Sequence, residues 1–266
     1  MYSQVGMSAT FLLGDCLSVM KGLSDKSVGL FICDLPYGQL DTKKRDIIQD
    51  YRRQQTGSGG CAWDIKLNLT EFWTQVKRLA KDDHTPVLMF CNTKFGYELI
   101  KSNESWFRYD LVWDKGHGVS FLLANKMPMK SHEMVYVFAK KGATYNRIDI
   151  KGDFKANCGN KGFITSKQYG ISTPQPAIGK DNTGKRCPLS VIPIAGKSAG
   201  GHPTEKPKEL YRWLIERYSA KDDVVLDPTA GSFNSILVAK ELGRKGIGIE
   251  KDTNFFWKAV AKIIST

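Results

Sequence analysis

The sequence predicts an open α/β fold, and two stretches carry this prediction. In each, an apolar run of strand length ends on an acid that a proline follows within two residues: residues 28–33 lead into Asp34, and residues 224–226 lead into Asp227. A third observation is that such runs alternate with segments whose apolar residues recur at helical spacing. Open α/β sheets place their chemistry at the carboxyl ends of the strands, so both acids are candidate site residues.

The other elements follow in chain order. Strands are expected at 11–13, 28–33, 86–91, 109–113, 134–139, 224–227 and 246–250, and helices from 17 and at 69–80, 94–101, 207–218 and 235–242. From residue 142 to 201 this periodicity disappears and Gly, Pro, Asn, Ser, Thr and Lys dominate. The sequence therefore predicts one domain made of residues 1–141 and 202–266, interrupted by an irregular insertion at 142–201.

The charge points to a polyanionic partner. The 266 residues carry a formal net charge of +12, and residues 140–200 hold eleven basic residues against three acids, so +8 of the excess lies in one segment. Residues 39–60 form a second basic stretch, which fits either a flap that touches phosphates or a merely solvated loop.

Composition also limits the class of protein. No signal peptide or membrane span is predicted, so we expect a soluble, cytoplasmic protein. The six cysteines form no C-x-x-C pair, which argues against a zinc site and a disulfide framework. The histidines at 84, 117 and 132 lack partners at metal-ligand spacing, so no metal is assigned.

The turn after the first strand suits a nucleobase. Tyr37 offers a flat apolar face, while the Asp34 carboxylate and the Leu35 carbonyl offer two acceptors. A planar heterocycle with an exocyclic amine would stack on the tyrosine and donate one hydrogen to each acceptor. The alternative is an ordinary turn, because Asp and Pro are common turn formers.

The second turn suits a nucleoside cofactor with a cationic head. Residues 227–232 form a small-residue turn, and after a helix the next strand ends on Glu250, the candidate for the ribose hydroxyls. The loop is not G-x-G-x-x-G, and Asp227 would repel a pyrophosphate. S-adenosylmethionine, with its ammonium and sulfonium groups, fits better than a dinucleotide.

A third motif, at 202–207, precedes that turn. Its hydroxyl (Thr204), its lysine (Lys206) and the free amides of the helix that follows could hold the carboxylate of a methionyl group. A helix entry capped by Thr204 is the plainer interpretation, and both can hold at once.

Taken together, these motifs resemble the β group of DNA amino-methyltransferases, which act on adenine N6 or cytosine N4. That family has an early Asp-Pro-Pro-Tyr motif, a central target-recognition segment and a late Asp-Pro-Phe-x-Gly-x-Gly motif. The resemblance rests on residues 14–15, 34–37, 63–64, 112–115, 132–138, 202–207, 227–232 and 250. It implies a Rossmann-like S-adenosylmethionine-dependent methyltransferase fold, with a seven-stranded, mostly parallel sheet, helices on both faces and one antiparallel strand.

The resemblance also implies a role for each matching residue. Asp34 and the Leu35 carbonyl would hold the target amine beside the cofactor, with Pro36 shaping the turn and Tyr37 stacking on the base. Asp34 would also bind the cofactor, together with the remaining positions: the cofactor's adenine at Asp15 and Cys16, its methionyl part at Asp227, Gly231 and Ser232, its carboxylate at Thr204 and Lys206, its ribose at Glu250, and further contacts at His202 and Thr229. Three positions depart from the family motifs, namely Leu35, Thr229 and Phe233.

The function implied is methyl transfer from S-adenosylmethionine to the N6 amine of an adenine flipped out of DNA, with 142–201 as the target-recognition region. Family members whose motif opens with aspartate mostly methylate adenine, so Asp34 favours adenine. Cytosine N4, an RNA substrate and an inactive nucleic-acid-binding scaffold stay open as alternatives. A homodimer and a separate restriction endonuclease stay open as further partners.

Overall fold

The computed structural model describes residues 3–6, 8–37, 66–119, 121–151, 164–166, 171–175, 185–196 and 205–264. The basic stretch at 39–60, the pair at 63–64, His202 and Thr204 therefore lie outside the described residues. The chain divides into two compact units: the first joins Met1–Asn146 to Ser190–Thr266, and the second is Arg147–Leu189.

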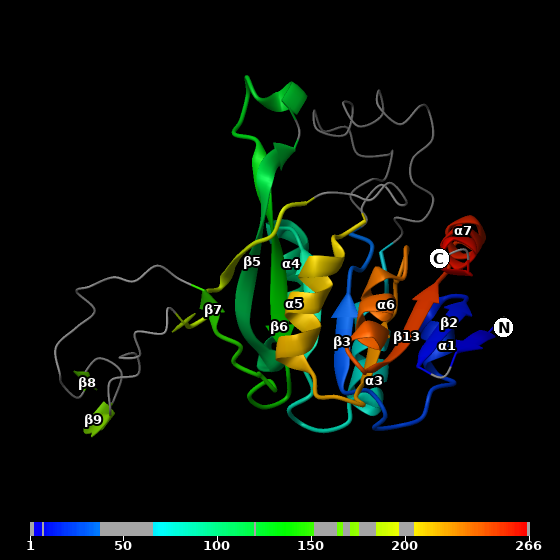
Figure 1. Ribbon diagram of the computed structural model, residues 1–266, viewed down its shortest axis with the longest axis horizontal. Coiled ribbons are helices and arrows are strands. Elements are labelled where there is room, and N and C mark those ends of the chain that lie inside the picture. The colour runs from blue at the N-terminus through cyan, green and yellow to red at the C-terminus, as the bar shows by residue number, and fades with distance from the viewer. Residues whose placement is uncertain are drawn as a thin grey trace. The chain divides into compact units, whose positions relative to one another are not determined.

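The first unit is organised around a nine-stranded sheet of order β1-β2-β13-β12-β3-β4-β6-β5-β11 (Figure 1). The strands, in chain order, are β1 Ser3–Gly6, β2 Ala9–Leu13, β3 Leu30–Cys33, β4 Val87–Cys91, β5 Phe107–Val119, β6 Lys130–Phe138, β11 Val191–Pro193, β12 Val224–Asp227 and β13 Lys245–Glu250. Neighbours are parallel except where β6 lies against β4 and β5 and where β1 lies against β2. The predicted α/β class with a mostly parallel sheet is confirmed; all seven predicted strands form, and β1 and β11 add an edge strand at each end.

Helices cover both faces of this sheet. They are α1 Cys16–Met20, α3 Leu69–Leu79, α4 Thr93–Ser102, α5 Lys208–Tyr218, α6 Asn234–Glu241 and α7 Thr253–Ile264, with 3-10 turns η1 Glu104–Trp106 and η2 Phe121–Leu123. One buried cluster joins α1, α3 and α4 to the sheet, and a second joins α5 and α6 to the opposite face. In a third, α6 and α7 pack with β2.

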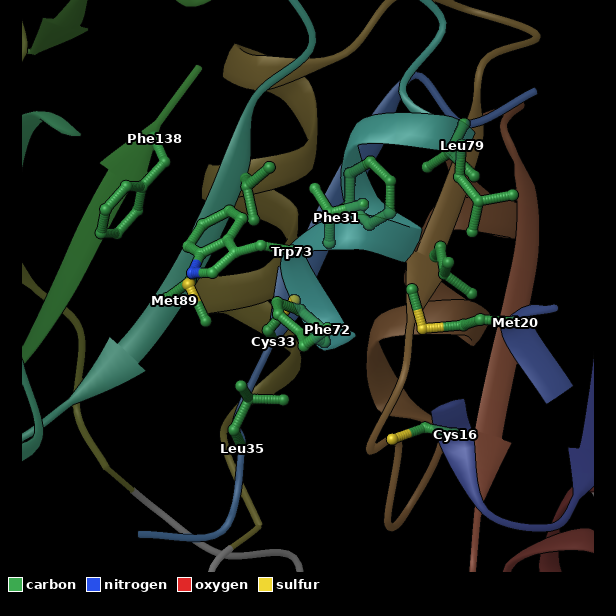
Figure 2. Close-up of a cluster of buried hydrophobic side chains, with 14 of the residues drawn as sticks. Cys16, Met20, Phe31, Cys33, Leu35, Phe72, Trp73, Leu79, Met89 and Phe138 are labelled. Atoms are coloured by element: carbon green, nitrogen blue, oxygen red, sulfur yellow. The ribbon is translucent and has the colours of Figure 1, made fainter. Parts of the chain in front are cut away.

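The central strands are apolar throughout because both of their faces are buried. In β3, Phe31 and Cys33 belong to the α3 side and Leu30 and Ile32 to the α5 side. Figure 2 shows Phe31 and Cys33 with Phe72 of α3 in the first of these clusters. A fully buried side chain of this size contributes about 1.5–3 kcal/mol, so this layer fixes where β3 ends.

The second unit contains two small antiparallel pairs. Strand β7 (Ile150–Lys151) pairs with β10 (Lys185–Arg186), and β8 (Ile164–Ser166) pairs with β9 (Ile171–Gln175). Residues 190–196, which the sequence placed in the irregular insertion, belong to the first unit because β11 pairs in parallel with β5. The role of the insertion in target recognition stays a prediction. Among the described residues, no helix is long and apolar enough to cross a membrane.

Candidate active site

The two acids singled out by the sequence lie at the ends of neighbouring strands. β12 and β3 pair in parallel, with Leu226 opposite Phe31; Asp227 ends β12, and Asp34 follows the last residue of β3. From β12 the sheet continues to β13 on one side, and from β3 to β4 on the other. Such a reversal of strand order opens a crevice at the carboxyl ends, which is where open α/β sheets bind ligands.

Each oxygen of the Asp34 carboxylate has a resident donor. The Tyr37 hydroxyl donates to Oδ1 over 3.1 Å, and the Lys206 ammonium forms an ion pair with Oδ2. The Tyr37 ring lies 4.9 Å from the ring of Phe95, tilted by 31°. Burial, followed by the negative charge of Asp34, raises the pKa of Tyr37 well above its usual value, so the hydroxyl remains a donor.

The first departure from the family motif is explained by packing. Leu35 is 1% exposed and belongs to the cluster beneath α3, where Figure 2 shows its side chain below Cys33. Its apolar side chain thus anchors the turn in the core. Pro36 follows and is half-buried.

Lys206 is a buried ammonium held by carboxylates. Only 4% exposed, it lies with Nζ 4.4 Å from the centre of the Phe90 ring. Burial alone would lower its pKa, but the charges of Asp34 and Glu133 outweigh burial and raise it, so Lys206 stays charged. The sequence expected this ammonium on the carboxylate of a methionyl group; in the structure it is paired with Asp34 instead.

Glu133 of β6 completes this group of charges. Its Oε2 lies 3.3 Å from Nζ of Lys115, which itself stands 4.8 Å over the ring of Trp113. Burial would raise the pKa of Glu133, but Lys206 and Lys115 outweigh it and lower that pKa. A group of alternating charges thus runs through Asp34, Lys206, Glu133 and Lys115, and we call it the charged cluster.

Asp227 differs from Asp34 in its partners. It is 2% exposed, and its direct hydrogen bonds come from the Ser235 hydroxyl (2.5 Å) and the Thr229 amide (3.0 Å). Burial outweighs these bonds and raises the pKa of Asp227 to about 7. Nearby, the Thr229 hydroxyl oxygen is buried and has no hydrogen-bond partner among the described residues.

The turn after Asp227 connects to the last predicted acid. Gly231 has φ +52°, and its amide donates to Oε2 of Glu250 over 3.0 Å, while the amide of Asp252 donates to Oε1 over 2.8 Å. Burial raises the pKa of Glu250. Ser232 is half-buried beside Gly231.

Phe233, another departure from the motif, starts α6 in the left-handed conformation with φ +59°. Glycine adopts this conformation without steric cost, which accounts for the family's preference for it here. Phe233 is fully buried, with its ring 4.9 Å from that of Phe11 and 5.7 Å from that of Phe256. Burial of the ring compensates for backbone strain of about 1–2 kcal/mol.

Asp15 lies at the same edge, directly after Gly14 at the end of β2. Its carboxylate caps α1 by accepting from the amide of Ser18 over 3.1 Å. Cys16 beside it is buried, and burial together with the charge of Asp15 raises its pKa to about 11, so the thiol is neutral and unreactive. Four adjacent parallel strands, β2, β13, β12 and β3, therefore have an acid at or just beyond their carboxyl ends.

Sequence reasoning missed the partners of these acids. Glu133 and Lys115 lay within recognised motifs but received no role, and Ser235 was only the start of a helix. Tyr211 was read as helix packing; its pKa is raised by burial first and by Asp227 next. The one local signal was a glutamate directly before the apolar run 134–138 of β6, at position 133.

The residues present fit a cationic nucleoside cofactor. Asp227 is a buried carboxylate that a cation would stabilise, and the unpartnered Thr229 hydroxyl can still donate or accept a hydrogen bond there. Among the described residues, His, Cys, Asp and Glu form no group of three or more that could hold a metal ion.

A mostly parallel α/β sheet with this edge of acids at the strand-order reversal defines a Rossmann-like nucleotide-cofactor enzyme. The model of a family described as DNA methylase matches residues 28–261, most of the chain, and the chain belongs to this family. The resemblance read from the motifs is thereby confirmed.

Similar proteins agree with this assignment. The DNA adenine methyltransferase YhdJ of Escherichia coli (strain K12) is 24% identical over 257 residues, which cover 92% of this chain and 79% of YhdJ. Among solved structures, the M1.HpyAVI–SAM complex is similar with TM-score 0.59 and 18% identity, covering 96% of this chain and 98% of that one. The cytosine-N4-specific PvuII DNA methyltransferase is similar with TM-score 0.63 and 16% identity, covering 96% and 86%. At these identities the solved structures show the shared fold.

Proposed function

We propose that this protein transfers a methyl group from S-adenosylmethionine to the exocyclic N6 amine of an adenine in DNA. The family assignment supports DNA as the substrate, and the adenine specificity in the name of YhdJ supports adenine. One observation carries the chemistry: Asp34 and Asp227 end neighbouring parallel strands, so a target amine at the first acid meets a methyl donor at the second.

The cofactor side is built from the three strands β12, β13 and β2. The ionised Asp227 attracts the ammonium of the methionyl part, and the Thr229 hydroxyl, Gly231 and Ser232 line the same turn. Glu250 takes the ribose hydroxyls, since its two oxygens, which accept from the amides of Gly231 and Asp252, keep lone pairs for further donors. Asp15, with Cys16 beside it, accepts from the adenine amine. The bound cofactor supplies an electrophilic methyl group on its sulfonium.

The target side is the turn at 34–37. Tyr37 and Lys206 each occupy one oxygen of Asp34, and each oxygen keeps a further lone pair with which to accept from the target amine. The Leu35 carbonyl accepts the second amine hydrogen. Two acceptors draw the nitrogen away from conjugation with the ring and localise its lone pair for in-line attack on the methyl group, whose bond to sulfur breaks as the bond to nitrogen forms. The excess proton of the methylated amine then leaves. Phe95 supports one face of Tyr37, so the flipped base stacks on the other.

Lys206 acts as a positioning residue in this proposal. Its ion pair holds the Asp34 carboxylate in place and compensates the negative charge there in a partly buried place. That Lys206 also holds the cofactor carboxylate stays a prediction. Asp34, Lys206 and Asp227 all belong to the first unit, so one chain holds both sites, and a homodimer and a separate endonuclease stay open as further partners.

The test is transfer of labelled methyl from S-adenosylmethionine to unmodified duplex DNA, single-stranded DNA and RNA, followed by nucleoside mass spectrometry. We expect N6-methyladenine in duplex DNA. Asp34→Asn, which keeps the size of the side chain but removes its charge, should lose at least about 100-fold in kcat while binding the cofactor with unchanged affinity. Glu98→Gln on α4, at an exposed ion pair with Lys66, is the matched control. N4-methylcytosine or label only in RNA would contradict the substrate, and no transfer despite cofactor binding would favour the scaffold alternative.

A further inference from the structure

The hairpin formed by β5 and β6 is longer than the sheet requires. β5 runs in the same direction as β3 and β4, so it continues past the edge where Asp34 lies, and Figure 1 shows the hairpin extending beyond the end of β3. The pairing shifts between Asp114, opposite His132, and Val119, opposite Lys130. Three extra residues on the β5 side make this a bulge, which bends a strand.

Glycines build the bend. Gly116 has φ +70°, and its amide donates to Oδ1 of Asp114 over 3.0 Å. At Gly118 an added Cβ would lie 2.6 Å from Cβ of Met129 on the opposite strand, so only glycine lets the two strands approach this closely. The extension is therefore a specific structure and not a slack loop.

The tip of the hairpin, residues 121–129, presents apolar side chains to solvent. Its turn is held by hydrogen bonds from the amides of Lys126 and Met127 to the carbonyl of Leu123, whose side chain is buried. Around this anchor, Phe121 is 73% exposed, and Met127 and Met129 are 44% and 38% exposed. An ordered turn thus holds an aromatic ring and two thioethers outward.

The charged side chains of the outer part of the hairpin are all basic. Residues 115–130 contain three lysines, one histidine and no acid. Exposed apolar side chains surrounded only by cations complement a polyanion whose interior is apolar, which describes the DNA duplex with its phosphates and stacked bases. Two such tips would repel one another.

The base of the hairpin touches the catalytic group. Lys115 and Glu133 belong to the charged cluster, which continues through Lys206 to Asp34. Strand β6 lies directly against β4, with Met134 opposite Cys91. The tip therefore rises beside the pocket that receives the target base.

We propose that the hairpin tip is the wedge that enters the base stack when the target adenine leaves it, with Phe121 and Met127 filling the space between the neighbouring bases. Unstacking a base costs a few kcal/mol, and inserted apolar side chains are one way to offset that cost. The lysines of the hairpin contact the flanking phosphates. This inference rests on the proposed methylation of DNA.

The test compares Phe121→Ala and the double variant Phe121→Ala/Met127→Ala with the unaltered protein on a duplex containing its mapped methylation site. A second duplex places the target adenine opposite an abasic position, where flipping is easier. We expect the double variant to lose about tenfold in kcat/KM on the matched duplex and less than about threefold on the abasic one. With 2-aminopurine as the target base, flipping raises the fluorescence on binding. This rise should be largest for the unaltered protein, smaller for Phe121→Ala and smallest for the double variant.

Ile264→Ala is the control variant, because Ile264 is 68% exposed at the end of α7, which packs on β2 and β13 at the other side of the sheet. Thermal midpoint and cofactor affinity should match the unaltered protein in every variant. Equal losses on both duplexes, no loss on either, or a change of oligomeric state in the tip variants would overturn the wedge. An unaltered protein that methylates no DNA would overturn the proposed function and the wedge with it, whereas an active protein indifferent to Phe121→Ala overturns the wedge alone.

Discussion

Asp227 makes cofactor binding depend on pH in a direction that the structure fixes. Burial raises the pKa of this carboxyl to about 7, and among the described residues a hydroxyl and an amide donate to it directly. The ammonium of S-adenosylmethionine binds the ionised form, so affinity must rise as pH increases through the pKa of the free protein. Above that pKa the affinity levels off, because the carboxylate is then already ionised.

The size of the effect follows from the ionised fraction. With a pKa of about 7, roughly one Asp227 in eleven is ionised at pH 6 and about three in four at pH 7.5. An apparent Kd equals the intrinsic Kd divided by the competent fraction, so it should fall about eightfold over this interval. The range ends at pH 7.5 because the amino group of the cofactor itself titrates near pH 8.

Calorimetry can measure both the affinity and the proton. Titrations at pH 6, 6.75 and 7.5 give the Kd values, and repeating them in two buffers of different ionisation enthalpy gives the protons released, close to one at pH 6. Asp227→Asn keeps the acceptor for the Thr229 amide but has no titratable charge, so it should bind weakly and independently of pH. A flat Kd in the unaltered protein, or an unchanged slope in Asp227→Asn, would refute the reasoning.

Three further predictions use the same site. Above pH 8, Asp227→Asn should stabilise the cofactor-free protein by up to about 4 kcal/mol. The reason is that the pKa of Asp227 is higher in the folded than in the unfolded chain, so its ionisation opposes folding. Denaturant melts measure the gain in unfolding free energy, which should vanish at pH 4, where Asp227 is protonated in the folded protein. Lys206→Met should lower kcat by at least about 100-fold with little change in cofactor Kd, while Lys208→Met, two residues along and exposed, should leave kcat intact. A cofactor defect equal to the kcat defect would contradict that role. Phe233→Ala should lower the free energy of unfolding by about 3–5 kcal/mol. Phe233→Gly should lower it by about 1 kcal/mol less, because glycine adopts the left-handed conformation without strain. A larger loss for glycine than for alanine would contradict the strain argument.

The acids of the site could be predicted because their signal is local. An apolar run that ends on an acid and a turn places that acid at a strand end, whatever the strand pairs with, and Asp34, Asp227 and Glu250 were found in this way. Their partners could not be found similarly. Lys206 lies 172 residues from Asp34 in the chain, and the two meet because Lys206 stands just before α5, which packs on β3 and β4.

Helix α7, strand β11 and the extension of β5 were not predicted from the sequence, each for a different reason. Helix α7 carries Phe256, Ala259 and Val260 at helical spacing, and Asp252 caps it through the amides of residues 254 and 255, so its signal was present and unused. Strand β11 is three residues long in a stretch rich in Gly and Pro, and its place is set by pairing with β5. The extension of β5 past Trp113 has glycines where a strand pattern expects side chains, because the bulge requires them.

The two acids at the centre of the site have different partners because they are proposed to bind different ligands. Asp34 carries its counterion within the fold, and Lys206 has Glu133, itself paired with Lys115, as a second nearby carboxylate, so the Asp34 carboxylate is oriented before any ligand arrives. A buried ion pair adds little to stability by itself, but it suits a group that must accept hydrogen bonds from a neutral amine. Asp227 has a hydroxyl and an amide instead of a paired cation, and its carboxyl is therefore poised near neutrality. The missing positive charge is the one that a cationic methyl donor brings, so the same edge of the sheet separates a site for a neutral base from a site for a charged cofactor.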